Sequence, residues 1–187
     1  MAMDYRQSVG LVLSELEAAL TSVDGAQAEA LADQILAADK VFLVGVGRVL
    51  LSLQAFCKRL NHLAVKAYFV GEINEPAITG SDLLIVGSGS GESLVPVAIA
   101  QKAKSLGAQI AHIGSNPDSS LAPITDLFVR IPVQTKFNYA GELQSRQIMS
   151  SLFEQSLLLF GDCVSLMIAR RQNLDVKSLW QYHANLE

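Results

Sequence analysis

A glycine- and serine-rich turn between an apolar run and a helix is the stretch best suited to chemistry. After the apolar residues 83–86 the chain reads Gly87, Ser88, Gly89, Ser90, Gly91, Glu92, Ser93. Glycines bring backbone N–H groups close to a ligand, hydroxyls add donors, and a helix N-terminus adds positive partial charge. The pattern predicts a phosphate site with Ser88, Ser90 and Ser93 as ligands. A flexible turn with a capping serine is the alternative.

Three other readings of the glycines fail on spacing. A Walker A loop ends in a Lys-Ser/Thr pair, but no lysine lies between Lys66 and Lys102. A serine-hydrolase elbow has glycines two residues either side of its serine, which neither serine of the turn has. The earlier Gly45-Val46-Gly47 turn has Leu50 in place of the third glycine of a dinucleotide fingerprint. Nucleotide chemistry is therefore disfavoured.

Two charged residues are candidates for the chemistry itself. Arg48 follows the Gly45–Gly47 turn and could reach substrate oxygens, with a surface ion pair as the alternative. Glu154 has only serine and leucine three and four positions away on its predicted helix. We therefore expect its carboxylate on an apolar face without a cation, where burial would make it a stronger base. A solvated carboxylate is the alternative.

The elements that must position these residues alternate between strand and helix. Apolar β-rich runs predict strands at 41–44, 65–70, 82–87, 109–113 and 126–131. Helical periodicity predicts helices at 5–20, 27–38, 48–63, a stretch ending at Gly107, and 143–171. The alternation predicts an α/β fold, a three-layer αβα sandwich with a five-stranded parallel, flavodoxin-like sheet in a single domain. Ligands bind beyond the carboxyl ends of such strands, where both glycine turns lie.

Composition narrows the class of protein. The chain has 187 residues, is half hydrophobic and carries a net charge of -4 without a basic run, which argues against nucleic acid as a ligand. Three scattered histidines and two cysteines give no metal spacing, so no metal is expected. The N-terminus does not read as a signal peptide, which predicts a cytoplasmic protein. The apolar stretch 152–169 contains Glu154 and Asp162, so it predicts a buried helix and not a membrane span.

Six short runs carry a resemblance to a known family. They are GVGR (45–48), KRLNHL (58–63), YFVGE (68–72), SGSGES (88–93), SRQIMSSLFEQ (145–155) and HANLE (183–187). With the strand pattern, the serine motif resembles the sugar isomerase (SIS) domain over residues 27–170. The remaining runs are similar to its 6-phospho-3-hexuloisomerase branch. The resemblance implies one SIS domain over 1–187, with N-terminal helices (1–38), a core (40–171) and a tail (173–187).

The resemblance also implies a reaction and its residues. It implies that 3-hexulose 6-phosphate and fructose 6-phosphate interconvert through an enediol, without cofactor, in the ribulose monophosphate route of formaldehyde fixation. Glu154 would be the base and His62 would move the hydroxyl proton. The implied substrate-binding residues are Gly47, Arg48, Ser88, Gly89, Ser90, Glu92, Ser93 and His183.

Two features of the sequence bear on the substrate and on assembly. Val49 replaces a serine of the family pattern, and Ile148 and Ser150 replace a proline and a glycine, which leaves the exact phosphosugar open. Apolar surface on the first and last helices predicts a homo-oligomer, and the resemblance favours a tetramer. The rings of Trp180, Tyr182 and His183 indicate that the tail docks on a neighbouring subunit, with a frayed tail as the alternative. A non-catalytic phosphosugar sensor is the alternative function.

Overall fold

Five parallel strands form the centre of the protein. The structure, a computed structural model, describes residues 3–175 and 177–186. The strands are β1 (Val41–Val44), β2 (Ala67–Phe69), β3 (Leu83–Gly87), β4 (Gln109–Gly114) and β5 (Leu127–Arg130). Their order across the sheet is β2-β1-β3-β4-β5, and every neighbouring pair is parallel. This is the doubly wound order of flavodoxin-like folds.

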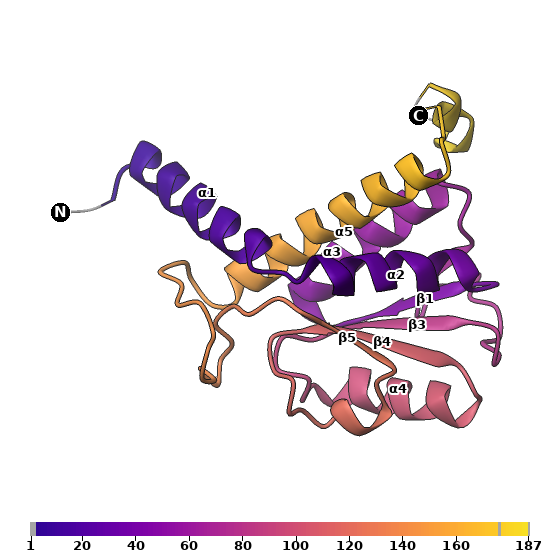
Figure 1. Cartoon of the computed structure of the whole chain (residues 1–187), viewed down its shortest axis with the longest axis horizontal. Helices are drawn as coiled ribbons and strands as arrows, with labels where there is room; N and C mark the ends of the chain where they lie inside the picture. Colours follow the sequence, from indigo (N-terminus) through magenta and orange to yellow (C-terminus); the bar gives the residue numbers. More distant parts are fainter. Residues whose placement is uncertain (1–2, 176, 187) are drawn as a thin grey trace.

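Helices cover both faces of this sheet (Figure 1). The helices are α1 (Tyr5–Thr21), α2 (Gly25–Ala37), α3 (Gly47–His62), α4 (Leu94–Ser105) and α5 (Ser151–Arg171), with short 3-10 helices η1 (Ala122–Ile124) and η2 (Ser178–Tyr182). One core lies between the sheet and α2, α3 and α5, and a smaller one lies between the sheet and α4. Strands buried on both faces are expected to be continuously apolar, as β1 and β3 are. The predicted three-layer αβα sandwich is confirmed.

The last helix begins later than its sequence pattern predicts. The prediction placed its start at Leu143, whereas α5 begins at Ser151. The residues in between are held as a loop, because the Glu15 carboxylate on α1 accepts hydrogen bonds from the Ser145 hydroxyl at 2.7 Å and the Arg146 N–H at 2.8 Å. These long-range bonds override the local helical pattern, and they fix the loop that follows β5.

The last helix, α5, packs inside the protein. By length and composition α5 could cross a membrane, but 61% of its most apolar 18-residue stretch is buried within the fold. It runs side by side with α3, and the two helices point the same way (Figure 1). Its apolar character is therefore accounted for by the core, in agreement with the prediction of a buried helix.

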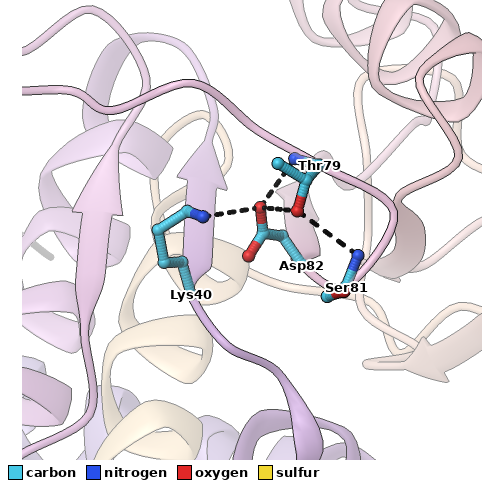
Figure 2. A network of polar contacts seen from close by, with 4 residues as sticks. All are labelled: Lys40, Thr79, Ser81 and Asp82. Carbon is cyan, nitrogen blue, oxygen red and sulfur yellow. Dashed lines mark hydrogen bonds and ion pairs between the residues drawn. The ribbon is translucent and has the colours of Figure 1, made fainter.

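A buried carboxylate joins the amino ends of β1 and β3, opposite the glycine turns. The Asp82 side chain is fully buried and accepts hydrogen bonds from the Thr79 N–H at 2.6 Å and the Thr79 hydroxyl at 2.8 Å (Figure 2). Lys40 completes the network with its Nζ atom 3.1 Å from the same oxygen. Burial acts to raise the pKa of Asp82, but the bonds from Thr79 and Lys40 together outweigh it and lower that pKa.

We predict that Asp82→Asn destabilises the fold by about 1 to 3 kcal/mol at neutral pH, because a buried charge-assisted network is broken. A carboxyl whose pKa is lowered by folding stabilises the protein above its unfolded pKa of about 4, and this contribution is lost as the pH falls through the lower folded value. The gap between wild type and variant should therefore narrow on acidification. Urea denaturation at about pH 7 and about pH 3.5 measures it.

Asp162→Asn is the matched control, since Asp162 forms an exposed ion pair with Arg59 at 3.4 Å. Such a pair contributes about 0 to 1 kcal/mol, so its loss should leave stability nearly unchanged. An Asp82→Asn variant as stable as this control would contradict the proposed role of the network.

Candidate active site

A cavity opens where the strand order reverses between β1 and β3. The chain leaves β1 for α3 on one face of the sheet and leaves β3 for α4 on the other, so a crevice forms at the two carboxyl ends. The cavity there has a volume of about 240 Å³. It is lined by Val46, Gly47, Arg48, Val49, Gly87, Ser88, Gly89, Ser90, Ser93, Gln134, Thr135, Lys136, Ser150, Phe153 and Glu154.

The predicted phosphate ligands all line this cavity. The Ser88 hydroxyl oxygen accepts the Gly91 N–H at 3.0 Å, and the Ser90 hydroxyl oxygen accepts the Glu92 N–H at 3.3 Å. Each hydroxyl keeps its own hydrogen for a ligand, because it acts only as an acceptor within the turn. Ser93 is the N-cap residue of α4 but makes no side-chain capping bond. Three O–H donors and a helix N-terminus thus converge on one cavity.

The base candidate also lines the cavity, next to a cation. Glu154 lies in the first turn of α5, and its carboxylate forms an ion pair with the Arg48 guanidinium at the start of α3. The Glu154 side chain is 12% exposed and that of Arg48 is 65% exposed. The prediction of cation-free surroundings is therefore wrong, because helical spacing gives only the neighbours on the same helix, and Arg48 comes from α3.

A hydrogen bond between the two helices fixes the backbone of this acid. The Ser52 hydroxyl on α3 donates to the Glu154 carbonyl oxygen at 2.7 Å. Together with the ion pair it sets the position of α5 relative to α3 beside the cavity. Gly47 starts α3 with a left-handed φ of +58°, which favours glycine there.

The loop between β5 and α5, which was not predicted to belong to the site, also lines the cavity. Gln134, Thr135 and Lys136 follow β5, and Ser150 precedes α5. The buried Glu142 carboxylate orders this loop by accepting the N–H groups of Thr135 at 3.0 Å and Tyr139 at 2.9 Å. One signal for the loop was available, since β5 is parallel to β3 and its carboxyl end meets the same edge of the sheet.

Two positions that depart from the family pattern lie in the cavity and one does not. Val49 and Ser150 line it, whereas Ile148 is exposed on the loop outside it. A valine at the first position presents methyl groups where a hydroxyl would offer hydrogen bonds. The departures at Val49 and Ser150 can thus affect substrate contacts directly.

Glu92 points away from the cavity. Its carboxylate accepts the Ser120 N–H at 2.8 Å and the Ser120 hydroxyl at 2.5 Å. These two bonds lower the pKa of Glu92. The prediction of Glu92 as a substrate ligand does not fit this geometry, in which the residue instead secures the start of α4 to the loop after β4.

His62 and His183 lie together at the far end of α3. Their rings stack at 5.3 Å, and with Arg59, Leu63, Leu179 and Trp180 they line a separate hollow of about 180 Å³. Burial, then Lys58, Arg59 and His183, lowers the pKa of His62. About 21 Å of helix, fourteen residues at the standard rise, separates His62 from Arg48. Within one chain, Glu154 and His62 therefore do not come together.

Comparisons with known proteins agree with this fold. Residues 34–159 match the SIS domain. A 3-hexulose-6-phosphate isomerase of Bacillus subtilis is 40% identical over 99% of this chain and 100% of its own length. A protein of the same name from Mycobacterium gastri is 38% identical over 98% of this chain and 92% of its length.

A solved structure extends the comparison to three dimensions. It is a hypothetical protein from Methanococcus jannaschii, for which a function of 3-hexulose-6-phosphate isomerase has been inferred. It superposes with a TM-score of 0.83 at 31% identity, covering 97% of this chain and 99% of its own. With the parallel sheet, the serine turn and these matches, the chain belongs to the SIS domain family.

Proposed function

We propose that this protein is a phosphosugar isomerase that interconverts 3-hexulose 6-phosphate and fructose 6-phosphate. The observation that carries the proposal is one cavity lined both by the serine turn, which suits an anion, and by Glu154. Relatives bearing the name of this activity match 98 to 99% of the chain. We assign the reaction to the cytoplasm, since charged phosphosugars do not cross membranes unaided. The family resemblance favours a place in formaldehyde fixation by the ribulose monophosphate route.

The geometry suggests how each wall contributes. The phosphate is held by the hydroxyls of Ser88, Ser90 and Ser93 and by the N-terminus of α4, so the carbon chain extends toward Glu154. The carboxylate removes the proton from C2 of the 3-ketose, which gives the 2,3-enediol, and protonation at C3 then gives the 2-ketose. Arg48, beside the carboxylate, is placed to donate hydrogen bonds to sugar oxygens.

His62 contributes to this site only from another copy of the chain. Its Nδ1 atom lies 3.4 Å from an Arg59 guanidinium nitrogen, which can only donate, so Nε2 carries the hydrogen of the neutral ring. Within the described residues that Nε2 is buried without a hydrogen-bond partner, at the ring that His183 of the same chain covers. We infer that it serves the proton transfer between the two sugar oxygens in a neighbouring subunit's cavity.

Assembly of several copies fits the exposed apolar surface. The α1 helix projects away from the sheet (Figure 1), and Tyr5, Val9 and Leu13 are exposed on it. Leu158, Leu159 and Leu166 are exposed on α5. Monomers rarely expose such surfaces, so we propose a homo-oligomer, most simply a tetramer, of single SIS domains. Docking of the tail, 173–187, on a neighbouring subunit stays a prediction, since His183 stacks on His62 of the same chain.

We predict that Glu154→Gln lowers kcat by about a hundredfold or more, the usual contribution of a positioned base, because the amide cannot accept the proton. KM should change little, since the side chain keeps its shape. A coupled assay of fructose 6-phosphate formation measures both constants. Asp162→Asn, two turns further along α5 and exposed, is the control and should retain full activity.

Near-normal turnover in Glu154→Gln would show that Glu154 is not the base. Phosphosugar binding by wild-type protein without any turnover would instead select the sensor function. Exchange of substrate protons with deuterated solvent, read by NMR, separates loss of the base from loss of a later step.

We predict that Ser88→Ala or Ser90→Ala weakens phosphosugar binding by about 1 to 3 kcal/mol, because each loses a hydrogen bond to a charged group. Titration calorimetry gives the affinities. Ser105→Ala is the matched control at the other end of α4, where the hydroxyl donates to the Lys102 carbonyl oxygen at 2.7 Å. Unchanged affinity in the double serine variant would restrict the turn to a structural role.

We predict that subunit mixing restores activity between two defective variants. Glu154→Gln and His62→Asn should each have low activity. Mixed oligomers, however, contain some sites with wild-type Glu154 from one copy and wild-type His62 from another. Turnover after co-refolding, compared with each variant refolded alone, tests this. No recovery in mixed oligomers, or a 20.1 kDa monomer in light scattering of active protein, would contradict the shared site.

A further inference from the structure

A buried histidine contacts the backbone of the serine turn from behind. His112 lies on β4, beside Val86 of β3, and its side chain is 1% exposed. Its Nε2 atom is 2.9 Å from the Ser88 carbonyl oxygen. A carbonyl oxygen only accepts hydrogen bonds, so Nε2 carries the hydrogen and donates it. His112 does not line the cavity itself.

The next two carbonyl groups of the turn are held from the same side. The Gly89 carbonyl oxygen accepts the N–H groups of Ser115 at 2.9 Å and Asn116 at 3.2 Å. The Ser90 carbonyl oxygen accepts the Asn116 side-chain amide at 3.3 Å. Three consecutive carbonyl groups are therefore directed toward β4 and the loop after it.

This arrangement fixes the direction of the N–H groups. In a trans peptide the C=O of one residue and the N–H of the next point in opposite directions. Holding the carbonyls of Ser88 and Gly89 toward β4 therefore turns the N–H groups of Gly89 and Ser90 away from it. Both residues line the cavity, and within the described residues neither N–H has a hydrogen-bond acceptor. Paired N–H groups of this kind form an anion-binding concavity.

We propose that His112 is a positioning residue that orients the serine turn for phosphate by holding the Ser88 carbonyl group away from the ligand. The proposal rests on the proposed binding of the substrate phosphate at this turn. Without the imidazole, the peptide between Ser88 and Gly89 can rotate and present its carbonyl oxygen to the anion. That rotation replaces an attractive dipole with a repulsive one.

The surroundings of the ring suit this role. Burial lowers the pKa of His112 to about 4, although its bond to Ser88 acts in the other direction, so the ring is neutral near neutral pH. The Phe128 ring packs against it at 5.0 Å. Gly91, at a φ of +68°, leaves room on the other side, since a Cβ there would lie 3.1 Å from the imidazole Cε1 and 2.3 Å from Ser119 Cβ. These contacts fix the position of the imidazole ring, with its Nε2 directed at the Ser88 carbonyl oxygen.

Two substitutions separate hydrogen bonding from packing. His112→Leu fills the space but donates no hydrogen bond, whereas His112→Gln places an amide N–H near the position of Nε2. We expect the leucine variant to raise KM, and the Kd for inorganic phosphate, by about tenfold, the effect of one misplaced charge-assisted bond, with kcat changed much less. The glutamine variant should recover both constants to within about threefold of wild type.

A purely structural role predicts a different result. It would lower the melting temperature of His112→Leu and leave KM and the phosphate Kd at wild-type values, which would overturn the proposal. Equal loss of phosphate affinity in the leucine and glutamine variants would also overturn it. Wild-type protein that binds neither phosphate nor phosphosugar would instead remove the proposed function.

A measurement on the wild-type protein keeps the test independent of folding of the variants. In a nitrogen-15 NMR titration with inorganic phosphate, the amide signals of Gly89 and Ser90 should shift, and the His112 ring should show a proton on Nε2 alone. Phosphate binding that leaves both amide signals unmoved, or a ring protonated on Nδ1 only, would refute the assignment.

Discussion

The parallel pairing of β3 with β1 on one side and β4 on the other is the constraint on which the rest of this protein depends. It brings the carboxyl ends of all three strands to one edge, with Val44, Val86 and His112 in register across the sheet. Because the connections after β1 and β3 leave on opposite faces, a crevice must open between them. The cavity is thus a consequence of strand order, and the residues that follow each strand decide its chemistry.

The parallel course of α3 and α5 adds a second constraint, on which groups can meet. Both helices begin at the cavity, so the first turns of each supply Arg48 and Glu154, which pair across the helix interface. The same geometry carries His62 to the opposite end of α3, where it stacks on His183 from the tail. A single chain therefore brings Glu154 and the anion-binding turn together but keeps His62 apart from them, which is why we propose that His62 acts from a second chain. In that proposal, the shared direction of the two helices links oligomerisation to catalysis.

Periodicity and turn chemistry were enough to predict the sheet, the layers and the serine turn, because all of these depend on local apolar patterns and on glycine. The start of α5 was missed because Glu15, 130 residues earlier than Ser145, holds the preceding loop through its carboxylate. The cation beside Glu154 was missed for the same reason, since Arg48 lies 106 positions away. The orientation of Glu92 toward Ser120 depends on a loop after another strand. A sequence pattern reports neighbours along the chain, and each of these errors concerns a neighbour across the fold.

The distribution of charge in the cavity explains why neutral donors carry so much of the proposed phosphate binding. Arg48 is already paired with Glu154, and Lys136, the other cation lining the cavity in the described part of the chain, is exposed with its Nζ 4.8 Å above the Phe137 ring. A cation placed against the turn would also attract the Glu154 carboxylate and so compete with the substrate for it, since opposite charges attract in a partly buried site. Peptide N–H groups and hydroxyls avoid this competition, because they stabilise a dianion through direction and carry no net charge. Direction must then be imposed by the fold, and a neutral, buried imidazole behind the turn imposes it without adding a charge of its own.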